Sequence, residues 1–288
     1  YHIEKQGDSD PEVSADKEKY MEKRMELLPG VTLTAVQTEK FKTGCFSINF
    51  FRPLRREEAA MNALIPSVLL RATARHPDIR SISAHLDELY GASLGSLVRK
   101  KGEVQTTGFF ADFIEDRFAG APVFRQTAEF LGEVLLDPAL ENGAFLPDTV
   151  SGERLNLENT IAARINDKRT WATSELLRVM CANEAYGVPR LGELEDVRAL
   201  DEKSLYAHYR ELLTHSQVEI FYMGSQSPDA AAEVFRDVLR DLPRGEITPC
   251  GTVVVPKADV VRSEERALDV TQGKLVLGFR TGCTLTDR

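Results

Sequence analysis

The sequence has no long apolar run. The best candidate in the 288 residues spans positions 63–70, and Pro66 and Ser67 interrupt it. A membrane-spanning helix needs about 20 consecutive, predominantly apolar residues. We therefore expect no transmembrane helix and no membrane partner.

Cysteine is scarce and shows no framework. Cys45, Cys181, Cys250 and Cys283 are far apart and form no CxxC pair, which favours free thiols in a reducing compartment. Residues 1–19 are polar and charged and contain no apolar core of a signal peptide. Both features predict a cytoplasmic protein.

A basic surplus is also missing. Acidic residues number 45 against 36 basic ones, so the formal net charge is −9. An acidic surface repels the phosphates of nucleic acids. We expect no nucleic-acid partner.

The common catalytic and phosphate-binding motifs are absent. The sequence contains no GxxxxGK[ST], no GxGxxG after a strand and no GxSxG. No two of its five histidines lie within four residues of each other, so no helix face offers two imidazoles to a metal. His85 and Glu88 match part of HxxEH, but Leu89 replaces the second histidine, and we interpret them as surface residues of an amphipathic helix.

The order of apolar patterns predicts an α+β fold. Residues 31–36 and 45–51 alternate as strands, and Thr43-Gly44 between them suggests a hairpin. Helical spacing covers residues 57–75, where Pro66 should kink the helix or begin a new one. Further helices are predicted over 81–89, 124–136, 148–167, 170–182, 201–213 and 228–242, a second hairpin over 94–113, and a strand over 218–223.

These patterns divide the chain into four parts. Residues 1–29 form a partly helical N-terminal extension, and residues 30–246 form one α+β domain. Residues 247–265, rich in proline, glycine and mixed charge, predict a linker. Residues 266–288 contain a last strand, Lys274–Phe279, which suggests that the chain stops at the opening of a second domain.

The sequential order of three stretches resembles the pitrilysin/insulinase family of zinc peptidases, which includes the mitochondrial processing peptidases. The first stretch comprises residues 61–73 and the following helix with its small-residue turn, residues 85–96. The second stretch is the helix over 145–166. The third stretch runs from 185 to 224. The residues that carry the resemblance are His85-Leu-Asp-Glu-Leu-Tyr-Gly-Ala-Ser-Leu-Gly-Ser96, Ala185-Tyr-Gly-Val-Pro-Arg-Leu-Gly192 and, for a second homologous domain, Gln272-Gly-Lys-Leu-Val-Leu-Gly-Phe279. The resemblance covers residues 30–282. It implies a mixed, largely antiparallel sheet with helices packed on one face.

The resemblance fails at the catalytic motif. The family's HxxEH falls on 63–67, so Ala63 and Ser67 replace the two zinc histidines and Pro66 replaces the general-base glutamate. Residues 59–72 contain no His or Glu, so no shift of register restores the site. Alanine has no donor atom, proline has no side-chain base, and a serine hydroxyl is a poor zinc ligand at neutral pH.

The family's third ligand is a glutamate on a later helix. Glu153 is the better match here, with Glu158 as the alternative. Without a metal, such a glutamate most simply forms a salt bridge or faces solvent.

The resemblance therefore implies the inactive subunit of a two-chain peptidase. It would supply half of a peptide chamber and pair with an active subunit that bears HxxEH, so zinc is expected only in that partner. Family substrates commonly add a strand to a sheet edge. We expect the edge within 97–113, where Gly108, Phe109 and Phe110 are candidate peptide contacts.

Two alternatives remain open. The same fold could serve as a scaffold or peptide-binding module with no associated proteolysis. An active metalloenzyme could instead use relocated ligands, such as His76 or His85 with Glu88 and Glu153. The spacing of the two histidines on either side of Pro77 argues against that third reading.

Overall fold

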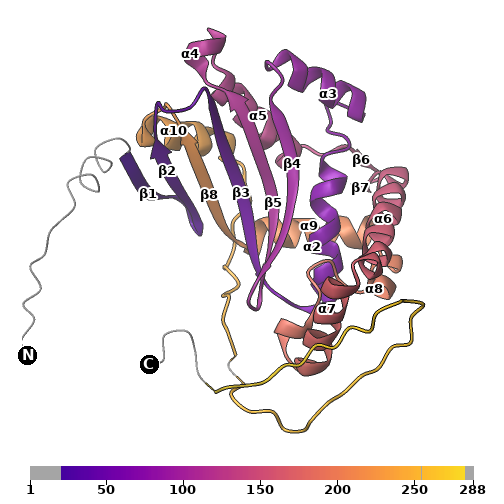
Figure 1. The fold of residues 1–288 in the computed structure, drawn as a ribbon. Coiled ribbons are helices and arrows are strands. Elements are labelled where there is room, and N and C mark those ends of the chain that lie inside the picture. The colour runs from indigo at the N-terminus through magenta and orange to yellow at the C-terminus, as the bar shows by residue number, and fades with distance from the viewer. Residues whose placement is uncertain (1–20, 254, 283–288) are drawn as a thin grey trace, which may run out of the picture.

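A six-stranded mixed sheet forms the centre of the fold. The structure, a computed structural model, describes residues 21–253 and 255–282. The strand order is β1-β2-β8-β3-β5-β4, and only β2 and β8 pair in parallel (Figure 1). The prediction of a mixed, largely antiparallel sheet is confirmed. The strands are β1 (Met21–Leu28), β2 (Val31–Gln37), β3 (Thr43–Pro53), β4 (Ser93–Lys101), β5 (Val104–Ile114) and β8 (Gln217–Gly224), with a small ladder of β6 (Leu140–Glu141) and β7 (Ala144–Phe145) outside the sheet.

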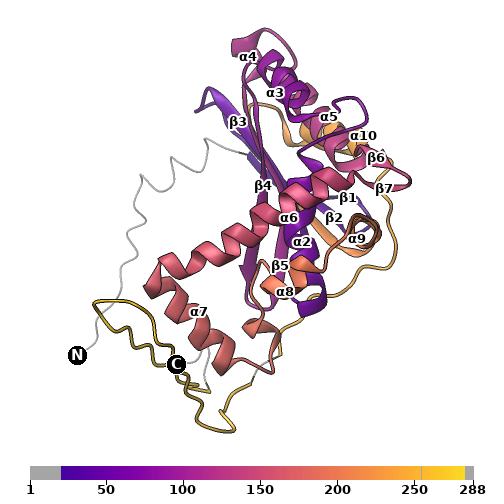
Figure 2. The ribbon, with the colours of Figure 1, turned by 90° about the vertical axis from the view of Figure 1, so that its right-hand side faces the viewer.

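Helices pack on one face of this sheet. Burial alternates along β3, where Phe46, Ile48 and Phe50 are buried against the helices and Ser47 and Asn49 on the opposite face are only partly buried. Figure 1 shows the strands in front of α2, α5 and α9, and Figure 2 shows α6 and α7 extending beyond the β4 side. The helices are α2 (Arg56–Leu69), α3 (Ile79–Glu88), α4 (Asp116–Ala119), α5 (Val123–Leu136), α6 (Pro147–Ala162), α7 (Lys168–Met180), α8 (Leu194–Arg198), α9 (Glu202–His215) and α10 (Pro228–Val238), with 3₁₀ turns η2 (Ala163–Asn166) and η3 (Ala185–Gly187).

The predicted hairpin between residues 31–36 and 45–51 is wrong. β8 lies between β2 and β3 and pairs with both of them. The central strands of a sheet are the most buried ones, and β8 supplies the buried side chains Val218, Ile220 and Tyr222 at this position. The short connection after β2 passes over β8 instead of making a turn.

The partly helical extension predicted over residues 1–29 is also wrong where the structure describes it, because residues 21–28 are not helical. Residues 21–28 form β1, which pairs antiparallel with β2 through a turn at Pro29-Gly30. Gly30 adopts φ +69°, a left-handed conformation that favours glycine. The charged residues Glu22, Lys23, Arg24 and Glu26 lie on this edge strand, where charge prevents unwanted pairing. The sheet therefore begins before residue 30, and the predicted segment 1–20 lies outside the described residues.

The C-terminal part of the chain is irregular. Residues 247–253 and 255–282 contain no helix or strand, so Lys274–Phe279 is not the predicted strand in this structure. Leu275, Leu277 and Phe279 are 83%, 68% and 80% exposed. A strand needs a neighbour to pair its backbone groups, and within the described residues this segment has none. Its assignment to a second domain stays a prediction.

In the part of the chain that the structure describes, no helix has both the length and the apolar character required to cross a membrane.

Candidate functional site

The helix that carries the degenerate motif lies beside a groove. The C-terminal half of α2, with α3, β4 and α6, encloses a space of about 310 Å³. Its lining is divided equally between five apolar and five polar residues, and Arg71 and Glu153 are the charged ones. The groove is lined by Ser67, Leu70, Arg71, Ile79, Ile82, Ser83, Leu86, Leu94, Ser96 and Glu153.

The three degenerate positions do not all face this groove. Ser67 lines it, whereas Ala63 and Pro66 are buried in the helix packing and are not among its lining residues. The structure therefore brings one of the three positions together with Glu153.

Glu153 is held by an arginine that the sequence analysis did not single out. Its Oε1 lies 2.5 Å from Nε of Arg71, and Nδ2 of Asn156 donates to the same oxygen over 3.2 Å. Arg71 lies in the turn just after the end of α2 at Leu69, so no helical spacing in the sequence indicated its role. Glu158, the alternative, instead accepts a hydrogen bond from Nε of Arg198 over 3.1 Å.

The residues present do not fit a catalytic zinc ion. A zinc site of this class needs three protein donors. Here Ala63 and Pro66 offer no side-chain donor, Ser67 offers a neutral hydroxyl, and the guanidinium of Arg71 already neutralises Glu153. No step through a metal can be derived from this groove.

His76 and His85, the alternative metal ligands considered from the sequence, lie close together in the structure, although their spacing in the sequence argued against a shared site. The rings of His76 and His85 have centroids 4.7 Å apart, and both pack on Phe130. Nδ1 of His76 is 2.7 Å from Oε1 of Glu133, whereas Glu88 is 3.8 Å from His85. Among the described residues, no group of three His, Cys, Asp or Glu side chains could hold a metal ion.

Pro66 does not break α2, because another residue compensates for its missing N–H. The helix continues through Pro66 to Leu69. A proline leaves the carbonyl four residues earlier without its helical donor. That carbonyl belongs to Asn62, and the hydroxyl of Thr107 on β5 donates to it over 2.7 Å.

The side chain of Asn62 extends this buried polar network. Its Oδ1 lies 2.7 Å from Nε2 of His208 on α9, and its Nδ2 donates to Gln105 on β5 over 2.9 Å. Gln105 then donates to the carbonyls of Ala59 and Arg190. Burial lowers the pKa of His208 below 6.5, so its imidazole is neutral at pH 7 and Nε2–H is the donor to Asn62. The network fixes α2 between β5 and α9.

The sheet edge beside the groove is β4, not β5. Nη1 of Arg190 donates to the carbonyl of Val98 over 2.8 Å, so this carbonyl points away from β5. Because backbone direction alternates along a strand, Leu94 and Ser96 also present their N–H and C=O groups outward. Both line the groove.

The three candidate peptide contacts lie on the interior strand β5. Phe109 is 1% exposed in the helix-side core, whereas Phe110 is 40% exposed on the opposite sheet face. A Cβ added to Gly108 would lie 2.0 Å from the carbonyl oxygen of Ile48, so close strand packing accounts for this glycine. β4 separates all three from a peptide added at the edge.

Replacing Arg71 with leucine is expected to lower the free energy of unfolding by about 1–2 kcal/mol. It would leave the carboxylate of Glu153, whose side chain is 10% exposed, without a counterion. The estimate is below that for a fully buried pair because the side chain of Arg71 is 39% exposed. Urea denaturation measures the change, and adding Glu153→Gln should recover most of it.

The matched control for this pair is Arg125→Leu. Arg125 pairs with Asp237 on the surface, where the side chains are 42% and 65% exposed. A loss below about 0.5 kcal/mol is expected. Equal losses for the two arginines, or no recovery with Glu153→Gln, would contradict the assigned role of Arg71.

Comparisons with known proteins identify proteins that are similar to this chain in sequence and in fold. No family model matches the sequence. The chain is 32% identical over 265 residues to the probable inactive metalloprotease YmfF of Bacillus subtilis (strain 168), covering 90% of this chain and 61% of the relative. It thus spans less than two thirds of that relative's length.

Solved structures share the fold. A conserved protein from Enterococcus faecalis V583 superposes with a TM-score of 0.76 at 27% identity, over 83% of this chain and 57% of that one. An inactive domain of peptidase M16 from Pseudomonas fluorescens superposes with a TM-score of 0.66 at 14% identity, over 83% and 55%. The order of sequence motifs, the sheet topology and the relationship to an inactive metalloprotease agree. The chain is similar in sequence to a probable inactive metalloprotease and shares its fold with an inactive domain of peptidase M16.

Proposed function

We propose that the chain is the inactive subunit of a heteromeric zinc peptidase. One observation carries this proposal: Arg71 neutralises Glu153 beside a groove that borders the edge strand β4. The chain itself would bind no zinc, and the metal would belong to a partner with an intact HxxEH.

The substrate in this proposal is a peptide that adds a strand to β4. The outward backbone groups of Leu94 and Ser96 would pair with its main chain, and the apolar residues of the groove would take alternate side chains. Main-chain pairing selects little by sequence. The expected substrates are therefore unfolded peptides with apolar side chains at alternate positions.

The proposed compartment is the cytoplasm. Cys45, Cys181 and Cys250 are free thiols in the described residues. Free, partly or fully buried thiols persist most readily in a reducing compartment.

Capture followed by reconstitution tests the proposal. The tagged full-length protein should co-purify at about one to one with a chain that bears HxxEH, and cleavage of an unstructured peptide should need both chains. If only the protein itself or a non-peptidase co-purifies, the two-chain peptidase is wrong and the scaffold alternative takes its place.

A variant of the sheet edge tests the peptide path in the same complex. Ser96→Pro removes an outward N–H that makes no bond to β5, so the sheet should tolerate it. We expect about tenfold slower cleavage, because one main-chain hydrogen bond to the peptide and its local fit are lost. Ser96→Ala keeps the N–H and should leave the rate unchanged, and equal rates for the two variants would exclude β4 as the peptide's edge.

A further inference from the structure

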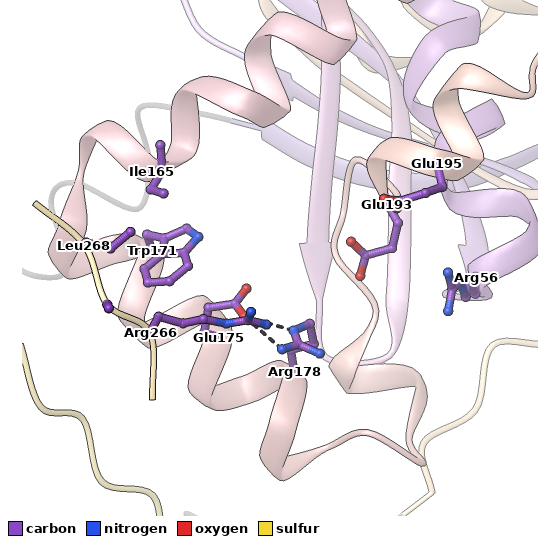
Figure 3. A pocket seen from close by; sticks show the side chains of 10 residues that line it. Arg56, Ile165, Trp171, Glu175, Arg178, Glu193, Glu195, Arg266 and Leu268 are labelled. Atoms are coloured by element: carbon purple, nitrogen blue, oxygen red, sulfur yellow. Dashed lines mark hydrogen bonds and ion pairs between the residues drawn. The ribbon is translucent and has the colours of Figure 1, made fainter. Parts of the chain in front are cut away.

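A second cleft lies at the other end of β4. It occupies about 630 Å³ between η2, α7 and the segment around η3. Lys100 and Gly102, from the end of β4 and its turn, line it, as do Trp171 and Tyr186. An adjoining space of about 570 Å³ shares Trp171 and is closed on one side by residues 266–268 (Figure 3).

Three cations in this cleft form no ion pair within 4.0 Å among the described residues, although the charge of Glu193 acts on Arg164 from farther away. Within the described residues, no carboxylate lies within 4.0 Å of a charged nitrogen of Lys100, Arg164 or Arg190, although each lines the cleft. Arg178 differs, because Glu175 and Glu264 bind it over 2.9 and 2.7 Å. A cluster of uncompensated cations is notable in a chain of net charge −9.

The donors of these cations are not equally available. Nζ of Lys100 donates to the carbonyls of Tyr186 and Val188, and Arg190 donates to Val98. Arg164 makes no hydrogen bond among the described residues, so its guanidinium keeps all its donors for a ligand. Burial and the nearby charge of Arg190 lower the pKa of Arg164, and an anion there would relieve both effects.

The acidic residues of the cleft do not cancel this charge. The carboxylate of Asp167 caps α7 by accepting from the N–H groups of Arg169 and Thr170. Glu175 is bound to Arg178. Glu193 faces the gap from the side opposite Arg178 (Figure 3), and it forms no ion pair within 4.0 Å among the described residues. Asp167 and Glu193, neither of them in an ion pair among the described residues, thus oppose three cations, and the lining as a whole keeps a net positive charge.

The rest of the lining is largely apolar or aromatic, with the hydroxyls of Thr170 and Ser174 among it. Ile161, Leu177 and Pro189 join the rings of Trp171 and Tyr186. The ammonium of Lys100 sits 4.5 Å from the centroid of the Tyr186 ring. A ligand that suits this lining carries a negative group attached to an apolar one.

The cleft and the groove lie at two ends of one edge strand. Leu94 and Ser96 line the groove, and Lys100 lines the cleft. From Leu94 to Lys100 an extended strand covers about 20 Å. A peptide of roughly seven residues whose N-terminal end lies in the groove would place its C-terminal end beside the three cations.

We propose that this cleft binds the C-terminal carboxylate of a peptide with an apolar last residue, and that Arg164 is its main hydrogen-bonding partner. The choice of a peptide rests on the proposed function, whereas the anion site rests on the unpaired cations alone. Arg190 lies between groove and cleft, and it would exchange its bond to Val98 for the incoming peptide.

The chain provides its own probe for this site. Trp171 lines the cleft and is the single tryptophan of the 288 residues. Titration of its fluorescence with acetyl-Ala-Leu-Leu that ends in a free carboxylate should give a saturable change. The same peptide with a C-terminal amide should bind at least about tenfold more weakly, because a charge-assisted hydrogen bond is lost.

Variants assign the effect to one residue. Arg164→Gln should weaken binding of the free acid by about tenfold or more and leave the amide unaffected, whereas Arg164→Lys should retain part of the preference. Arg236→Gln, at an exposed position on α10, is the matched control and should bind like the parent. Circular dichroism confirms that each variant is folded.

Each other outcome overturns the proposal. Equal binding of acid and amide, or no effect of Arg164→Gln, removes the carboxylate site but leaves peptide addition at β4 intact. Competition by inorganic phosphate at the same concentration as the peptide shows a general anion cleft instead. Absence of a co-purifying active subunit would instead affect the proposed function alone.

Discussion

Replacing Asn62 with alanine should lower the free energy of unfolding by about 3 kcal/mol. The change leaves Nε2–H of His208 and the amide oxygen of Gln105 buried without their partners. Each unsatisfied buried group costs about 1–3 kcal/mol, and the two groups share one network, so their costs do not simply add. Urea denaturation at pH 7, where His208 is neutral, measures the loss.

Asn49→Ala is the matched control for this prediction. Asn49 is partly exposed on the opposite sheet face, and among the described residues its side-chain amide donates only to the hydroxyl of Ser47. We expect a loss below about 1 kcal/mol. Similar losses at positions 49 and 62 would mean that the buried network does not hold α2.

Gly108→Ala should cost about 3 kcal/mol or more, or prevent folding. The added methyl would lie 2.0 Å from the carbonyl oxygen of Ile48 and 3.0 Å from the Cα of Asn49, both backbone atoms. Backbone in the middle of a sheet cannot move aside cheaply, so overpacking here exceeds the usual cost of 1–3 kcal/mol. Thermal and urea unfolding of the purified variant measure it.

Gly152→Ala provides the contrast, because a Cβ there meets nothing within 4 Å on α6. Alanine favours a helix over glycine by about 1 kcal/mol, so this variant should be as stable as the parent or more so. If Gly108→Ala folded normally and lost only peptide binding, Gly108 would be a peptide contact as the sequence suggested.

The helices and the second hairpin were predictable because their signals are local. The apolar spacing of α5 and the turn between β4 and β5 depend only on neighbouring residues. The position of β8 was not predictable in this way, because its pairing with β2 depends on contacts between residues almost 190 positions apart. The charge pattern of β1 misled for a related reason: Glu and Lys suit both an exposed helix and an edge strand.

That Ala63, Pro66 and Ser67 supply no histidine or carboxylate follows from the sequence alone, whereas their equivalence to HxxEH stays a prediction. The role of Arg71 could not be predicted from the sequence, because it depends on an ion pair with Glu153 on α6, 82 positions along the chain. The proline at position 66 predicted a kink in the helix or the start of a new one, whereas α2 continues through it. Thr107 supplies the missing donor from a strand, and no pattern within α2 could reveal it.

The late arrival of β8 sets the order in which this chain can fold during synthesis. β1 with β2, and β3 with the β4–β5 hairpin, can form from the first 114 residues, but their facing edges stay unpaired until residues 217–224 emerge. At typical translation rates, that interval lasts on the order of ten seconds. For that time two half-sheets with apolar faces and open edges coexist on one nascent chain, which makes this stage the most vulnerable to aggregation and the natural point for a chaperone to act.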